Sequence, residues 1–203
     1  ITRYNKQALS ENPMRRLLEF RKEDGTVIKI CGYDSALYTW DGDKLSGDFE
    51  IDLDKLDFEI YGNKVYFVDG NSYYVYDGET FKEVTASGGT NSDLTPIKRC
   101  TIIMQRGQRL FFSGDKEHPN SLYFTEVGNP SYVKTDNVIN AITDDDDYIT
   151  ALFEYQGALV VWKRKAIFAW FGYDPYSDVE FKRIPAHMGT VSKRTVCLAN
   201  NIL

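Results

Sequence analysis

Aspartate and histidine side chains are the first candidates for metal chemistry in this sequence. The four consecutive carboxylates of Asp144–Asp147 could bind a hard cation such as Ca²⁺. An EF-hand spaces its ligands at alternate positions with a glycine at the sixth, and this run lacks that pattern. His118 and His187 lie in unrelated loops, and neither has a second histidine or cysteine at zinc-ligand spacing. We therefore predict a solvated acidic loop and no metal site.

Catalytic motifs are equally scarce. The sequence has no GxSxG elbow, P-loop or GxGxxG motif, and Ser87–Thr90 (SGGT) lacks the strand-then-helix context of a nucleophile elbow. Asp24-Gly25-Thr26 is faintly similar to the Asp-box turn of sialidase-like propellers, but Lys22 and Val27 break that pattern. A carboxylate pair for glycoside hydrolysis stays open, because folding could bring two acidic residues about 5–10 Å apart. We predict no catalytic residue, no cofactor and no enzymatic activity.

Basic and aromatic residues are the candidates for binding. Lys163-Arg164-Lys165 could contact phosphate or an acidic partner, although a solvated hairpin turn is the favoured interpretation. Tryptophans could stack on sugars, but we expect most of them to fill the core, because aromatic side chains bury a large area. An aromatic residue also recurs in the middle of every third strand, which favours packing over glycan binding. The tryptophans are Trp40, Trp162 and Trp170, and the recurring residues are Tyr38, Tyr74, Tyr123 and Phe168.

Composition sets the outer bounds. The chain has 203 residues, a formal net charge of -6 and a hydrophobic fraction of 42%, which indicate a globular protein without a basic nucleic-acid-binding surface. Cys31, Cys100 and Cys197 lie in apolar runs, so we expect three buried thiols and a reducing compartment. No signal peptide or membrane-spanning run is recognisable. Because the first residue is Ile1 and Leu203 stands in the middle of an apolar run, we expect a piece of a longer protein.

The elements that must position these residues are short antiparallel strands. Lys64–Val68 and Tyr73–Tyr76 alternate with period two, and Asp69-Gly70-Asn71 between them predicts a tight hairpin turn. The same pattern of two apolar runs around a polar turn recurs at Asn63, Gln108, Gly157 and Asn201. These turns are 45, 49 and 44 residues apart. A third run follows each complete pair.

A period of about 45 residues with three or four strands per unit is typical of a β-propeller. We therefore predict an all-β fold, a single propeller domain over 1–203 that belongs to a longer propeller. The approximate blades are 14–56, 57–99, 100–149 and 150–198, with a fifth beginning after them. A β-sandwich of the same strand count is the alternative. No convincing amphipathic helix is expected. We expect the loops Thr85–Pro96 and Gly114–Ser121 to form subunit or partner contacts.

One stretch, RLFFSGDKEHPNSLYFTEVGNPSYV at Arg109–Val133, resembles propeller proteins in the virions of tailed bacteriophages. Such proteins carry an RLFF-G strand, a Pro-Asn loop, a LY-(S/T)-E strand and a GNP turn in this order. LYTWDG at Leu37–Gly42 and HMGTVSKRTVCLANNIL at His187–Leu203 are similar to two further segments of that family. Family members are far longer than this chain.

The resemblance implies a non-enzymatic virion structural protein, a subunit of the tail or of the head-to-tail conduit for DNA. It implies a homo-oligomer that contacts other virion proteins, assembled in the host cytoplasm, with DNA passing nearby without specific binding. The negative net charge is compatible with a conduit, because like charges repel phosphate at short range. Two alternatives remain: a carbohydrate- or receptor-binding propeller with a glycan as partner, and a glycosidase-type propeller.

Overall fold

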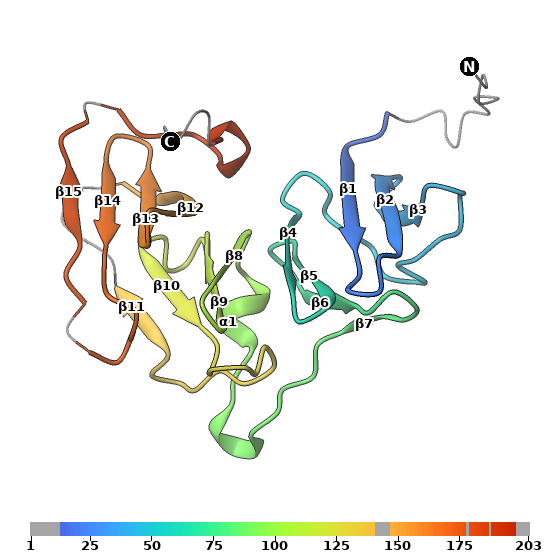
Figure 1. Cartoon of the computed structure of the whole chain (residues 1–203), viewed down its shortest axis with the longest axis horizontal. Coiled ribbons are helices and arrows are strands. Elements are labelled where there is room, and N and C mark those ends of the chain that lie inside the picture. Colours follow the sequence, from blue (N-terminus) through green and yellow to red (C-terminus); the bar gives the residue numbers. More distant parts are fainter. Residues whose placement is uncertain (1–12, 141–146, 178, 187, 198–203) are drawn as a thin grey trace.

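The computed structural model describes residues 13–140, 147–177, 179–186 and 188–197. Their strands form four antiparallel sheets, which we call blades 1 to 4 in chain order (Figure 1). Blade 1 has three strands: β1 (Arg16–Arg21), β2 (Val27–Tyr33) and β3 (Ala36–Thr39). Blade 2 has four: β4 (Asp57–Tyr61), β5 (Lys64–Val68), β6 (Tyr73–Tyr76) and β7 (Phe81–Glu83).

Blade 3 also has four strands: β8 (Ile102–Arg106), β9 (Arg109–Ser113), β10 (Ser121–Phe124) and β11 (Val138–Asn140). The four strands of blade 4 are β12 (Ile149–Tyr155), β13 (Ala158–Lys163), β14 (Ile167–Trp170) and β15 (Lys182–Ile184).

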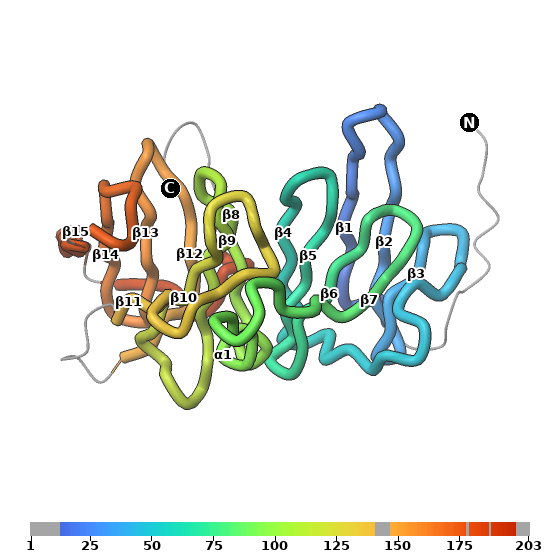
Figure 2. Tube along the Cα trace, turned by 90° about the horizontal axis from the view of Figure 1, so that it is seen from below, coloured from blue at the N-terminus to red at the C-terminus, as the bar shows by residue number. Residues whose placement is uncertain are grey.

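Every blade is a simple meander in which consecutive strands are hydrogen-bonded neighbours. The first strands of blades 2, 3 and 4 lie side by side, since β8 contacts both β4 and β12. The blades follow one another across the molecule in chain order (Figure 2). Four separate small sheets stacked in this way are propeller blades, so the predicted all-β propeller is confirmed and the two-sheet sandwich is wrong.

The predicted hairpin in blade 2 is confirmed at both strands. β5 pairs with β6 in the register Val65↔Tyr76 to Val68↔Tyr73. Gly70 in the turn has φ 84°, a left-handed conformation that glycine adopts without steric cost. Asp69 beside it is fully buried. The turn is therefore fixed by its aspartate as well as by its glycine.

The hydrophobic core lies between neighbouring blades rather than within any one of them. Three clusters of buried side chains fill the three spaces between consecutive blades. Strand residues alternate between the two faces of each blade, so one blade contributes to two clusters. In blade 2, Val65 and Phe67 face blade 1, while Tyr66 and Val68 face blade 3. Each blade is thus stabilised mainly by its neighbours.

Three short helical segments connect or follow the blades. η1 (Gly89–Asn91) and α1 (Thr95–Lys98) join blade 2 to blade 3, and η2 (Lys193–Thr195) follows blade 4. Pro96 stands in the first turn of α1, where its missing N–H leaves no hydrogen bond unmade. Within the described ranges, none of the helices has the length and apolar character to cross a membrane.

Candidate functional site

The candidate site is a pocket of about 560 Å³ on the side of the molecule where the first strands of blades 2, 3 and 4 begin. The turn before β4, the start of β8, the β9–β10 loop and the start of β12 form its walls. Residues 191–194 of the segment after blade 4 complete it. This volume falls in the range of small-molecule and peptide sites, about 300–1,000 Å³.

An ion pair between Asp57 and Lys193 holds the segment after blade 4 against the inner strands. The Lys193 ammonium donates to Asp57 Oδ2 at 2.8 Å and to the carbonyl of Ile103 at 2.5 Å. Asp57 Oδ2 also accepts the Ile103 N–H at 2.9 Å. Blade 2, blade 3 and the segment after blade 4 therefore meet at one carboxylate.

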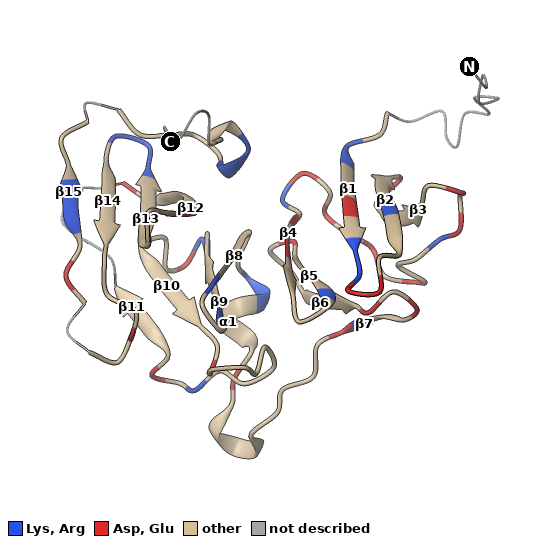
Figure 3. Ribbon diagram, viewed as in Figure 1, with Lys and Arg blue, Asp and Glu red and all other residues tan. Residues whose placement is uncertain are grey.

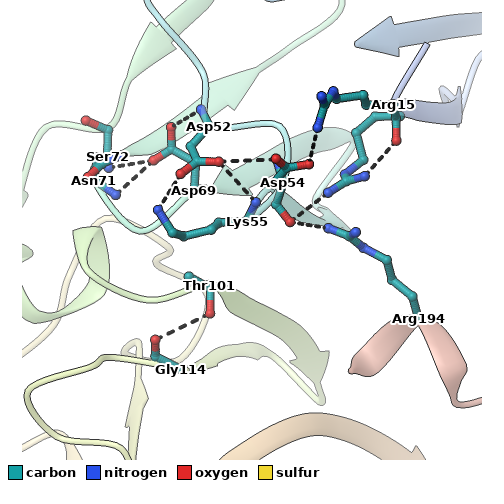
Figure 4. Close-up of polar contacts among 11 residues, drawn as sticks. Arg15, Asp52, Asp54, Lys55, Asp69, Asn71, Ser72, Thr101, Gly114 and Arg194 are labelled. Carbon is teal, nitrogen blue, oxygen red and sulfur yellow. Dashed lines mark hydrogen bonds and ion pairs between the residues drawn. The ribbon is translucent and has the colours of Figure 1, made fainter. Parts of the chain in front are cut away.

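Three arginines gather around Asp54, next to this pair (Figure 4). Arg15 binds the Asp54 carboxylate at 2.6 Å. Arg16 and Arg194 donate to the Asp54 backbone carbonyl at 2.9 and 2.7 Å. Burial lowers the pKa of Arg16, and the neighbouring Arg194 charge lowers it further. The site therefore brings three like charges together around one residue, with one of them on its carboxylate and two on its backbone carbonyl.

Buried aspartates anchor the turns that form the walls. Asp69 Oδ1 accepts the N–H groups of Asn71 and Ser72 at 3.0 and 2.8 Å, and its Oδ2 accepts that of Asp52 at 3.2 Å (Figure 4). Asp52 in turn binds Lys55, and this hydrogen bond lowers the Asp52 pKa. These contacts fix the 52–55 turn at the rim of the pocket.

Asp115 plays the same part in blade 3. Its Oδ2 accepts two hydrogen bonds from Arg99, at 3.1 and 2.9 Å, and one from the Tyr123 hydroxyl at 3.3 Å. Its Oδ1 accepts the Glu117 N–H at 3.0 Å. Burial, reinforced by the Asp115 charge, raises the pKa of Tyr123 to about 12. Both carboxylate oxygens of Asp115 are therefore engaged within the chain.

Glu59 lies on the innermost strand of blade 2, two residues beyond Asp57. Burial raises its pKa, although the Lys193 charge partly opposes this effect. Glu59 Oε1 accepts the Ile60 N–H at 3.1 Å. Glu59 does not line the pocket. The pocket carboxylates of Asp54, Asp57 and Asp115 are all ion-paired, so this arrangement provides charged binding groups rather than an acid–base pair.

The acidic run differs from its prediction in the part that is described. Asp144, Asp145 and Asp146 lie outside the described residues. Asp147 is buried rather than solvated: its carboxylate accepts the N–H groups of Lys165 at 2.8 Å and Tyr148 at 3.0 Å. It ties the start of blade 4 to the β13–β14 turn. His118 is exposed, His187 lies outside the described residues, and the described residues contain no metal-binding cluster.

The basic cluster is only partly a solvated turn. Arg164 and Lys165 are exposed, but Lys163 has an exposure of 0%, with its ammonium 5.8 Å from the centre of the Phe168 ring. Lys163 also accepts the Thr190 N–H with its carbonyl, at 2.9 Å. The prediction of a solvated Lys163 is therefore wrong, because the segment after blade 4 covers this turn.

The aromatic residues mostly pack in the core, as predicted. Tyr74, Tyr123 and Phe168 are buried, and Tyr38 is half-buried and stacked on Tyr33. They therefore offer no repeated surface for glycans. Trp170 is buried between blades 3 and 4, whereas Trp40 is 47% exposed and does not fill a wedge. Trp162 is half-buried.

The thiols are buried at two of the three predicted positions. Cys31 and Cys100 are inaccessible, but Cys197 is exposed. The apolar run around Cys197 predicted a strand, and residues 198–203 of that run lie outside the described residues. The predicted turn of a fifth blade at Asn201 lies outside them as well.

The motif residues at 109–133 form the joints of blade 3. Arg109 donates to the Thr125 carbonyl at 2.7 Å and lies 5.2 Å from the centre of the Tyr176 ring of blade 4. Tyr176 donates to Glu126. On the other side, Asn129 accepts from Ser87 at 3.2 Å, in the connection from blade 2. The motif therefore links three consecutive blades.

The two loops predicted as contact sites are each only partly free to contact another molecule. Part of Thr85–Pro96 is engaged within the chain, since the Ser87 N–H binds the Ser131 carbonyl at 2.8 Å and that of Asp93 binds Val133 at 2.9 Å. In Gly114–Ser121, the tip at 116–119 is exposed, and its base is held by Asp115. Each loop therefore has an exposed run of four residues, 88–91 in the first and 116–119 in the second. The second loop is also held to blade 4, because the Pro119 carbonyl accepts the Ile149 N–H at 3.0 Å.

Sequence reasoning missed the Asp54–Asp57 turn and the Lys193–Arg194 pair. These polar residues match no known sequence motif, and the residues in contact are 136 and 140 positions apart in the sequence. A signal was present in the spacing of the blades: each first strand is preceded by a connection that must reach the centre of the propeller. That signal indicates where connections converge, but not which side chains they carry.

Together these features define the chain as a β-propeller, with a pocket of charged and apolar side chains where the inner strands begin. It is similar in structure to the WD40 domain of Pan2 from Neurospora crassa, with a TM-score of 0.50 and 13% sequence identity. The match covers 88% of this chain and 51% of that chain, so the chain spans about half the length of that domain. At this identity the similarity shows the fold alone. The sequence matches no protein-family model and no curated protein.

Proposed function

We propose that this chain is the propeller part of a non-enzymatic structural protein in the virion of a tailed bacteriophage. In this role it is a subunit of the tail or of the head-to-tail conduit. The proposal starts from the resemblance at Arg109–Val133. The observation that carries it is that these motif residues join blades to one another, as the contacts of Arg109, Glu126 and Asn129 illustrate. A motif used for joints suits a load-bearing subunit better than a substrate site.

Exposed apolar side chains support an oligomeric subunit. Phe171, Tyr173, Met188 and Val191, in blade 4 and the segment after it, are between 61% and 76% exposed. Large exposed apolar residues are typical of protein–protein contacts. Here they lie at two ends of blade 4: Tyr173 is beside the β12–β13 turn, and the 188–191 segment is beside the β13–β14 turn. In our proposal this part contacts a second copy or another virion protein, and closed rings are the usual result of repeated head-to-tail contacts.

The first experiment combines light scattering after size exclusion with negative-stain imaging of the full-length protein that contains this chain. A ring of several subunits with an axial opening is the expected result. A second arm probes density-purified phage particles with an antibody raised against this chain. Absence of the chain from particles that encode it would overturn the proposal, whatever the oligomeric state in solution. The chain in multiple copies per particle would sustain it.

The exposed tip of the β9–β10 loop tests the contact directly. Removing residues 116–119 deletes an exposed surface that includes Lys116 and Pro119 of the pocket lining. We expect fewer infectious particles at unchanged expression of the protein. Lys29→Gln, in β2 of blade 1, changes an exposed position that lies neither in this loop nor in the part proposed to contact a second copy, and it is expected to leave infectivity unchanged. Full infectivity of the deletion variant would remove this loop from the proposed contact.

A further inference from the structure

Charge balance distinguishes the pocket from the rest of this acidic protein. Every carboxylate that lines it is neutralised by a cation: Asp54 by Arg15, Asp57 by Lys193 and Asp115 by Arg99. Lys55, on the rim, is paired with Asp52. Among the described residues, therefore, every acidic side chain that lines the pocket has a cationic partner.

Two cations of the pocket lining have no such partner. Within the described ranges, neither Lys116 nor Arg194 forms an ion pair, and Arg194 has only its hydrogen bond to the Asp54 carbonyl. Behind Arg194, Arg16 donates to the same carbonyl, and its buried Nε finds no acceptor among the described residues. Basic residues at the start of β1 and on η2 lie on either side of this region (Figure 3). The pocket thus carries surplus positive charge at short range.

Apolar side chains form the remaining walls. Leu56, Ile149 and Pro119 line the pocket, and Tyr148 and Val191 stand at its edge with 44% and 76% of their surfaces exposed. A ligand that places a carboxylate against Arg194 would bring its neighbouring groups against these side chains. The walls therefore favour a ligand that combines negative charge with apolar groups.

Size and net charge favour a peptide over a nucleic acid. A pocket of about 560 Å³ accommodates a few amino-acid residues, whereas a duplex is far broader than such a cavity. The net charge of -6 repels an extended polyanion. A short acidic segment is attracted by the pocket cations at distances well below the Debye length, about 10 Å at 0.1 M salt.

We propose that this pocket binds a short acidic peptide segment of a partner protein, with Arg194 and Lys116 contacting its carboxylates and Tyr148 and Val191 its apolar side chains. This inference does not depend on the proposed virion function. It concerns one pocket of the chain and is tested on the isolated protein.

The test measures fluorescence polarisation with a labelled hexapeptide of alternating glutamate and leucine. The matched probe replaces each glutamate with glutamine. We expect the acidic peptide to bind and the amide peptide to bind at least about tenfold more weakly, because charge-assisted hydrogen bonds to arginine are lost. Equal binding of both peptides would overturn the proposal.

Charge-removing variants locate the site. Arg194→Gln and Lys116→Gln are each expected to weaken binding of the acidic peptide about tenfold. Lys182→Gln removes the same charge from an exposed position on β15 and is expected to have no effect. All three positions are on the surface, so circular dichroism and thermal unfolding serve as the folding check. Equal affinities for all variants would place the peptide elsewhere and overturn the proposal.

Competition separates the anion classes. We expect neither inorganic phosphate nor a short DNA duplex, at matched charge concentration, to displace the bound peptide. Displacement by phosphate alone would indicate a general anion site. Displacement by DNA with higher affinity would indicate a nucleic-acid site. Either outcome would overturn the assignment to an acidic peptide.

Discussion

At the scale of single residues, two aspartates in the same turn dipeptide contribute very differently to the structure. Asp24-Gly25 and Asp69-Gly70 are the same dipeptide, each in a turn between two strands. Asp24 is exposed and accepts only the Thr26 N–H, at 2.8 Å. Asp69 is fully buried and accepts three backbone N–H groups. One dipeptide therefore forms a simple turn in blade 1 and a structural anchor in blade 2.

Replacing each of these two aspartates in turn distinguishes the stability contributed by a simple turn from that contributed by the buried Asp69. Asp69→Ala is expected to lower the free energy of unfolding by about 2–4 kcal/mol, because three backbone N–H groups lose their acceptor at once. Asp24→Ala serves as the control and is expected to cost much less, since water reaches the Thr26 N–H. Urea unfolding followed by circular dichroism measures both. Equal losses in the two variants would contradict the anchoring role of Asp69.

Glu59 gives the protein a pH dependence that can be assigned to one side chain. Burial raises its pKa above the usual value near 4.5. A carboxyl group with a raised pKa in the folded state destabilises that state as the pH rises above 4.5, because the unfolded chain loses the proton more readily. Below that pH both states are protonated and the effect vanishes.

Glu59→Gln is therefore expected to be more stable than the unchanged protein at pH 7. The difference is expected to shrink as the pH falls from the raised folded-state pKa through the ordinary value near 4.5. Urea titrations at several pH values between 4 and 8 measure this difference. Glu50→Gln, at an exposed position, is the control for a general charge effect. A difference that stays constant across this range would contradict the assignment.

At the scale of elements, the connection from blade 2 to blade 3 packs closely against blade 3. Gly88 has φ 91°, and a side-chain carbon at this position would lie 2.6 Å from the Tyr132 ring. Gly89 next to it also has a positive φ, 64°, but a carbon there would meet no atom within 4 Å. The two glycines share a backbone requirement and differ only in their surroundings.

This difference yields a matched pair of variants. Both Gly88→Ala and Gly89→Ala carry the cost of a left-handed alanine, about 1 kcal/mol. Gly88→Ala is expected to lose a further 1–3 kcal/mol, roughly the range for overpacking, because the ring of Tyr132 must move. Thermal and urea unfolding give the two values. If the variants were equally stable, the connection would not be packed against blade 3 in solution.

Strand pairing was the part of the fold that sequence could predict. The Asp-Gly turns and the period-two alternation located Lys64–Val68 and Tyr73–Tyr76 at their observed bounds, because both signals are local. Burial of polar residues was not predictable in this way. Lys163 and Asp147 lie in runs of like charge that are usually solvated, and only the folded chain shows that distant segments cover them. The pocket likewise depends on Arg194 meeting Asp54 across 140 residues.

At the scale of the whole molecule, the stability of each blade depends on the core that it shares with its neighbours. The three core clusters lie between neighbours, so the described part of blade 1 shares a cluster with blade 2 alone, whereas blades 2 and 3 each share two. In repeat architectures of this kind, a terminal unit with one neighbour opens more readily than an internal unit with two.

Hydrogen exchange followed by mass spectrometry tests this gradient. We expect the amides of β2 and β3 in blade 1 to exchange faster than those of β8 and β9 in blade 3, although all four strands are hydrogen-bonded. The comparison uses the same protein under conditions in which exchange reports the opening equilibrium. Equal protection of the two pairs would indicate a single cooperative unit instead of a graded stack.

The joint between blades 3 and 4 contains its own optical reporter. The Arg106 guanidinium lies 5.0 Å from the Trp170 ring and 4.8 Å from the Tyr173 ring, and Trp170 is buried in the core between these blades. Indole fluorescence depends on nearby charge and on access of water. Separation of the two blades would change the emission of Trp170 before the rest of the chain unfolds. In a variant with phenylalanine in place of Trp40 and Trp162, the fluorescence of this side chain can therefore record the opening of one joint in real time, without any attached dye.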